Sequence, residues 1–196
     1  MAEIICTETN VRLFRNSEPV PCDKPAGYVV VIDTERKKVY VERRDQKRKN
    51  VYCATHANNQ AAIAYRKTIK AGTITAIAEF GVSKRNPEGS LAMTVMVHDQ
   101  PMDPHFGIKI RIEKAWDFHL NEENRVYTGQ ISGGSHGGAD MDQVRRHAAG
   151  LMTAVQLHDD ILEWIGDGSL ANLAATVAKV NALNTAWDLQ QVKTDR

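Results

Sequence analysis

The sequence predicts an α+β protein, in which a small zinc-stabilised module with a β-hairpin and a helix precedes an antiparallel sheet and a C-terminal helical hairpin. Three observations lead to this prediction. All three cysteines fall within the first 53 residues, beside two runs rich in Val, Tyr and Ile. The middle of the chain alternates apolar and polar residues with the period of a half-buried strand. The last third repeats apolar residues at spacings of three and four, which is typical of packed helices. We expect three regions, at residues 1–72, 73–138 and 139–196.

Composition excludes several classes of protein. The 196 residues are 42% hydrophobic and 25% charged, which is close to the globular average and argues against disorder or a fibre. Residues 1–10 lack a basic stretch followed by an apolar run, and no segment approaches the ~20 apolar residues of a membrane span. We therefore expect a cytoplasmic protein without membrane contact. An odd number of cysteines fits poorly with a disulfide framework.

The net charge of +1 divides into two unlike parts. Residues 1–70 contain 14 Lys+Arg and 8 Asp+Glu, whereas the remaining 126 residues contain 11 and 16. The N-terminal third is therefore basic, and the rest of the chain is acidic.

The basic third predicts a hairpin followed by a helix. Residues 27–33 and 38–42 are β-rich runs joined by a polar turn at 34–37, and a third short strand is expected at 50–53. Residues 57–70 then have a helical apolar face with lysines near the end, and a glycine follows as a stop signal.

The cysteines form a candidate metal set with one histidine. Cys53 and His56 are spaced Cys-x2-His, which brings two ligand atoms within one turn of backbone. Cys6 and Cys22 complete a Cys3His set, one of the usual structural zinc sets. Because all four positions would be protein ligands, we expect a structural Zn²⁺ whose binding supplies much of the folding free energy of a small module. The alternative is that the cysteines are small buried hydrophobes.

This order of ligands resembles a treble-clef zinc finger, in which a hairpin leads to a helix whose first turn supplies the last two ligands. The string C…C-x2-PA…YC-x2-H is also similar to small bacterial and phage zinc modules, over about residues 6–70. The resemblance implies a phage or mobile-element accessory protein. The common treble clef begins with a Cys-x2-Cys knuckle, but here fifteen residues separate Cys6 from Cys22, so the resemblance supports Cys6 least.

Residues 36–49 contain eight basic and two acidic residues. Their net charge of +6 equals the net charge of residues 1–70. These cations can contact phosphates, and a tyrosine can stack on a base. We expect a partner that is nucleic acid or an acidic protein surface, including the acidic part of a second copy. The alternative is a solvated hairpin that protects an edge strand. The candidate binding residues are Arg36, Lys37, Lys38, Tyr40, Arg43, Arg44, Lys47, Arg48 and Lys49.

The middle region predicts four strands. Residues 106–116 alternate isoleucine with charged residues. One face of this strand is therefore expected to be buried and the other exposed to solvent, as in an antiparallel sheet. The connection at 99–105 is too short for a crossover helix. The strands are expected at residues 73–82, 91–98, 106–116 and 126–131.

Two loops of this region contain candidate functional residues. His98, Asp99, Asp103 and His105 could bind a metal, although Asp and Pro are common in turns for other reasons. The glycine-rich residues 132–138 lack the lysine of a phosphate-binding loop, which favours a flexible joint.

The last region predicts two helices. The first is expected at 139–166 with Asp140 as its N-cap, and the second begins at the cap Ser169 and reaches Trp187. The apolar stripe of the first helix runs through Val144, Ala148, Leu151, Val155, His158, Leu162 and Ile165. Because two helices cannot bury all their apolar faces, we expect a homodimer, with an interface at Leu151, Val155, His158 and Leu162.

These observations favour a non-enzymatic protein that binds nucleic acid, or a host protein that handles nucleic acid, through the basic hairpin. A first alternative is a small metal-dependent phosphohydrolase using the His/Asp loops, because His158-Asp159 is similar to the metal-binding pair of HD-type enzymes. A second alternative is a structural or assembly homo-oligomer.

Overall fold

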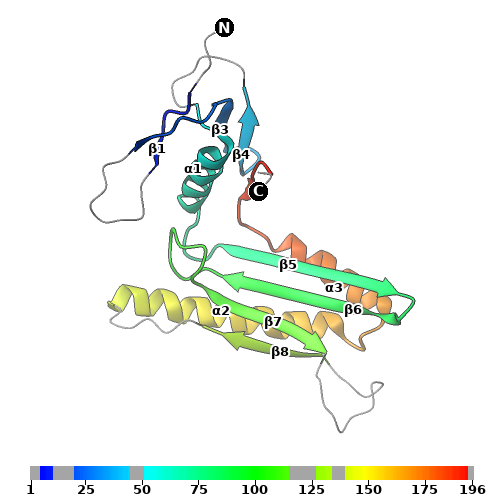
Figure 1. Ribbon diagram of the computed structural model, residues 1–196. Helices are drawn as coiled ribbons and strands as arrows, with labels where there is room; N and C mark the ends of the chain where they lie inside the picture. The colour runs from blue at the N-terminus through cyan, green and yellow to red at the C-terminus, as the bar shows by residue number, and fades with distance from the viewer. Residues whose placement is uncertain (1–4, 11–19, 45–50, 115–126, 134–139, 194–196) are drawn as a thin grey trace. The chain divides into compact units, whose positions relative to one another are not determined.

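A computed structural model describes residues 5–10, 20–44, 51–114, 127–133 and 140–193, and it confirms the α+β class (Figure 1). The chain divides into two compact units. Unit 1 consists of both ends of the chain, Met1–Thr68 and Trp187–Arg196, and unit 2 is the continuous segment Ile69–Ala186. Within the described residues, no helix has the length and apolar character needed to cross a membrane.

Unit 1 is built around the predicted hairpin. Strands β3 (Tyr28–Asp33) and β4 (Lys38–Arg43) pair antiparallel, and the helix α1 (Ala54–Arg66) packs on both of them. The side chain of Asp33 accepts a hydrogen bond from the backbone of Arg36 at 2.9 Å, which closes the turn. A separate short pair, β1 (Thr9–Asn10) and β2 (Val20–Pro21), precedes the hairpin.

The C-terminal end of the chain completes unit 1. Strand β9 (Asp188–Gln190) pairs in parallel with β4 and places Leu189 beside Val39, which is fully buried. The residues after β9 bind α1 through Asn58. Its side-chain amide donates to the carbonyl of Val192 at 2.9 Å, and its side-chain oxygen accepts from the Val192 amide at 3.0 Å. The N-terminal module therefore contains a strand from the other end of the sequence.

Unit 2 is a four-stranded antiparallel sheet with two helices on one face (Figure 1). Helix α3 covers β5 and β6, and α2 covers β7 and β8. The isoleucines of β7 face the helices and are buried, whereas the charged residues between them lie on the other face. The strands, in sheet order, are β5 (Ile74–Ser83), β6 (Asn86–Val97), β7 (Ile108–Lys114) and β8 (Tyr127–Ser132).

The two helices are capped as predicted. Asp140 and Gln143 form a capping box at the start of α2 (Met141–Ile165), and Ser169 caps α3 (Leu170–Ala182). The prediction that the second helix reaches Trp187 is wrong. The chain leaves the helix after Ala182, because the amides of the two residues before Trp187 turn to donate to the carbonyl of Ile74 at the sheet edge.

The buried face of α2 also differs from the predicted stripe. Val144, Ala148 and Val155 are exposed. Gly150 lies on the face that meets the sheet, where a Cβ would lie 2.9 Å from Ile108 Cδ1 and 3.3 Å from Asp99 Cβ, so a larger residue would require these side chains to shift. The predicted stripe omitted Gly150 and Ala154, whose small side chains give a weak apolar signal. The buried residues of α2 are Gly150, Ala154, Leu157, Ile161 and Ile165.

Asn181 protects the open edge of the sheet. Its side chain donates to the Ala78 carbonyl at 3.0 Å and accepts from the Ala78 amide at 2.9 Å, so it replaces a neighbouring strand at that point of β5.

We expect Asn181→Ala to lower the free energy of unfolding by about 2 kcal/mol, because both backbone groups of Ala78 lose their partner. Urea unfolding would measure this. Ala178→Gln, on the exposed side of the same helix, serves as the control, and equal stability of the two variants would contradict this role.

Candidate metal centre

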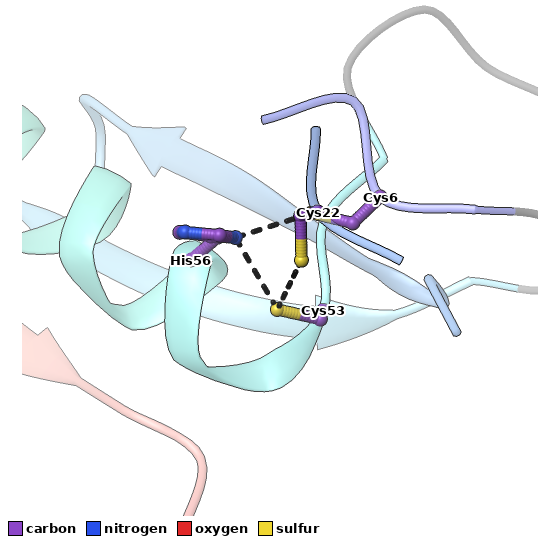
Figure 2. Close-up of side chains that lie close together, drawn as sticks. All are labelled: Cys6, Cys22, Cys53 and His56. Carbon is purple, nitrogen blue, oxygen red and sulfur yellow. Dashed lines mark hydrogen bonds between the residues drawn. The ribbon is translucent and has the colours of Figure 1, made fainter. Parts of the chain in front are cut away.

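The four residues of the predicted Cys3His set converge in unit 1 (Figure 2). Their ligand atoms all lie within 4.8 Å of one another. The side chains of Cys6, Cys22 and Cys53 are buried, and His56 is partly buried. Ala26 and Tyr52 pack against the three thiols and form a small apolar cluster around them. The group can therefore hold one metal ion away from bulk water.

Pairing of two short segments brings Cys6 and Cys22 together. The amide of Cys6 donates to the carbonyl of Lys24 at 3.1 Å, and the amide of Cys22 donates to the carbonyl of Glu8 at 2.9 Å. These bonds flank the β1–β2 pair, so the two segments run antiparallel beside each other. The long spacing between the two cysteines thus becomes a short distance in space.

The other two ligands come from the start of α1. Cys53 is the N-cap residue, and its side chain makes no capping hydrogen bond. His56 lies three residues further on, within the first turn. Two backbone hydrogen bonds between Tyr28 and Tyr52, of 2.8 and 3.1 Å, attach the residue before Cys53 to the hairpin. The hairpin therefore holds the first turn of α1 in place, and this turn positions Cys53 and His56.

The distances fit a tetrahedral ion. The Nδ1 atom of His56 lies 3.3 Å from Cys6 Sγ and 3.4 Å from Cys53 Sγ, and the sulfurs of Cys22 and Cys53 are 4.0 Å apart. Around one zinc ion with ordinary bond lengths, ligand atoms are separated by about 3.8 Å for two sulfurs and about 3.6 Å for sulfur and nitrogen. A disulfide needs about 2.05 Å, and all three cysteines are free. The imidazole also turns Nδ1 toward the thiols and Nε2 away from them (Figure 2).

A buried thiolate at this site needs a compensating positive charge. Burial raises the pKa of the Cys6 thiol, because a thiolate there would lose its hydration. Backbone hydrogen bonds from Cys53 and Glu8 lower this pKa in part, and the charge of the Cys53 side chain raises it. Burial likewise raises the pKa of Tyr52, with smaller contributions from Glu8 and Cys6. Three thiolates this close together repel one another unless a metal ion compensates their charge.

The described part of the basic stretch lies on the β3–β4 hairpin. Three of its cations have acidic neighbours. Lys38 Nζ lies 3.6 Å from Asp188, Arg44 donates twice to Glu42 at 2.9 and 2.7 Å, and Arg36 Nε lies 3.9 Å from Asp33. The side chain of Arg36 is 80% exposed. Lys37 and Arg43 are also exposed, and Tyr40 is half-buried in β4. Lys47, Arg48 and Lys49 lie outside the described residues.

Two histidines of unit 2 contact groups other than a metal set. His98 is buried, with Nδ1 lying 3.1 Å from the Phe106 carbonyl and Nε2 3.3 Å from the Thr75 hydroxyl. His147 Nδ1 lies 2.6 Å from a carboxylate oxygen of the buried Asp99. Across the described ranges, the Cys3His set is the one group of three or more Cys, His, Asp or Glu residues placed to hold a metal.

The residues predicted for a dimer interface divide between core and surface. Leu151 and Leu162 pack against the core of unit 2. His158 lies over Gly129 of β8, where any Cβ would collide with the imidazole ring. Val155 is 49% exposed. Much of the predicted interface is therefore in contact with its own sheet.

Sequence reasoning missed Asn58 and the exposed methionines of α2. Asn58 is a poor helix former in the middle of a helix, which is a weak signal, but nothing in the sequence links it to Val192. Met141 and Met152 extend the outward face of α2. A helical wheel would have placed them on a second apolar face, opposite the buried one.

Comparisons with family models, with curated proteins and with solved structures found no match to this chain.

Proposed function

We propose that this chain is a non-enzymatic binding protein whose unit 1 is held together by a structural zinc ion. The convergence of Cys6, Cys22, Cys53 and His56 supports this proposal above all. Three thiolates and an imidazole suit zinc better than calcium or magnesium, which take oxygen ligands. Because the protein supplies all four ligands, no coordination position is left for a catalytic water.

The zinc ion would join parts of unit 1 that otherwise have little shared core. Cys6 and Cys22 come from the β1–β2 segments, and Cys53 and His56 from the start of α1. The buried residues of unit 1 are few and small, with the thiols themselves among them. We therefore expect metal binding to supply much of the folding free energy of this unit.

The β3–β4 hairpin is the proposed binding surface, and nucleic acid is its proposed partner. Arg36 and Lys37 lie at the tip of the hairpin, and Arg43 lies at its other end. All three are exposed, so they can approach phosphates without a large desolvation penalty. The resemblance of residues 6–70 to small bacterial and phage zinc modules supports an accessory role for a phage or mobile element.

A charge reversal at the hairpin tests this proposal. We expect the triple variant Arg36→Glu, Lys37→Glu, Arg43→Glu to weaken binding of a fluorescent DNA or RNA oligonucleotide by about a hundredfold or more at low salt. Affinity of the unchanged protein should fall steeply with added salt, because bound phosphates release counterions. Fluorescence anisotropy over a salt series gives both quantities.

The control uses the same chemistry elsewhere. Lys84→Glu with Arg85→Glu reverses two exposed charges at the turn between β5 and β6, and we expect it to leave affinity within about threefold. Equal losses in both variants, or no binding by the unchanged protein at low salt, would contradict nucleic-acid binding. In the second case, capture of an acidic protein from nuclease-treated extract, lost in the triple variant, would favour the protein partner.

A further inference from the structure

Helix α2 has a second apolar face, which is exposed within the described part of its own unit. Met141 is 63% exposed, Val144 46%, Met152 75% and Val155 49%, and Ala148 between them is also exposed. These residues recur at spacings of three and four, so they form one stripe along the helix. At about 100° per residue, the stripe points away from the buried face that contains Gly150, Ala154, Leu157 and Ile161.

The charges beside this stripe are divided along the helix. Arg145, with a side chain 72% exposed, flanks the N-terminal half and pairs with Asp142 in its own helix at 2.9 Å. Asp159, 66% exposed, and the exposed Glu163 flank the C-terminal half on the same side. One end of the outward face therefore contains Arg145 with its partner Asp142, and the other end contains the carboxylates of Asp159 and Glu163.

We propose that this face pairs with the same face of a second copy of the chain, with the two α2 helices antiparallel and crossing at Met152. Two residues oppose each other across such an axis when they are equally far from Met152 along the chain. Arg145 then faces Asp159 of the second copy, and this pairing occurs twice. A parallel pair would instead place Arg145 beside Arg145. The charges of this face therefore complement those of a second copy in an antiparallel pair and oppose them in a parallel pair.

The composition of the stripe suits a helix pair. Ala148 and the neighbouring exposed Ala149 permit close approach of two helices, and methionine side chains adapt to an irregular surface. An interface limited to one helix per copy is smaller than the roughly 1,600 Å² of a standard complex. We therefore expect a reversible dimer with a dissociation constant in the micromolar range, about 1 to 100 μM.

Mass measurement of the full zinc-loaded chain tests the dimer. Light scattering or sedimentation over about 5 to 300 μM should show the mean mass rising from one chain toward two. Met152→Glu should raise the dissociation constant about tenfold or more, because the charge would be buried against its own copy. Met102→Glu replaces another methionine of unit 2, 55% exposed, and should change nothing. A mass of one chain throughout, or a dimer that Met152→Glu leaves intact, would overturn the proposal.

Charge exchange and cross-linking test the direction. Arg145→Glu should weaken the dimer, and Arg145→Glu combined with Asp159→Arg should restore it. Met152→Cys should form a disulfide between copies under mild oxidation. Arg145→Cys should not, because fourteen residues of helix separate the two copies of that position by about 21 Å, beyond disulfide reach. Cross-linking at both positions would show a parallel pair and would contradict the proposed geometry.

Discussion

Replacing His56 with alanine is expected to release the metal ion and to unfold unit 1, while unit 2 keeps its structure. His56 Nδ1 lies within 3.4 Å of two of the three thiols, so its loss leaves three thiolates that no longer surround an ion. Structural zinc contributes about 10–16 kcal/mol in zinc-finger peptides, and we expect loss of one ligand to remove at least about 3 kcal/mol of that. Unit 2 contains its own core of fifteen buried residues, so it should not depend on the ion.

Zinc content and limited proteolysis together measure this effect. The unchanged protein should hold one zinc ion per chain and resist cleavage in residues 51–68, whereas His56→Ala should hold almost none and be cleaved there. His105→Ala removes an exposed histidine from a loop of unit 2 and is the matched control. Full zinc content in His56→Ala, or equal loss in both variants, would show that His56 is not a ligand.

Removing residues 187–196 is expected to destabilise unit 1 even when zinc is present. The truncation removes β9, uncovers the fully buried Val39, and leaves the side chain of Asn58 without its partner at Val192. Loss of apolar burial and of these hydrogen bonds together should lower the free energy of unfolding by about 3 kcal/mol or more. Urea unfolding of the zinc-loaded protein, followed by a probe in unit 1, measures the change.

A pair of point variants separates the helix contact from the strand. Asn58→Ala should lower the free energy of unfolding by about 1 to 2 kcal/mol, because the partly buried amide and carbonyl of Val192 lose a partner. The adjacent Asn59→Ala changes an exposed side chain of the same helix and should stay within about 0.5 kcal/mol of the unchanged protein. If truncation and Asn58→Ala both leave unit 1 unchanged, the C-terminal strand is not part of its stable structure.

The four metal ligands could be predicted from the sequence, but the strand pairing that brings Cys6 and Cys22 together could not. Cys53 and His56 share one helical turn, so their proximity follows from local geometry. Cys6 and Cys22 meet only because their segments pair as antiparallel strands. Such pairing depends on contacts between two segments, and the residue pattern within one segment does not identify its partner.

The helix faces and the last strand show the same limit. Apolar spacing located both C-terminal helices, but Val144, Ala148 and Val155 of the predicted stripe are exposed, and Gly150 and Ala154, which the stripe omitted, lie on the face that meets the sheet. Three residues of β9 give too short a pattern to read as a strand. Its pairing with β4 joins positions about 150 residues apart, which sequence-local reasoning does not reach.

X-ray absorption at the zinc edge, on protein purified without chelator, tests the central claim most directly. One zinc ion per chain should show three sulfur ligands at about 2.3 Å and one nitrogen at about 2.0 Å. A first shell of nitrogen and oxygen alone, or less than half a zinc ion per chain, would contradict a structural zinc site at Cys6, Cys22, Cys53 and His56.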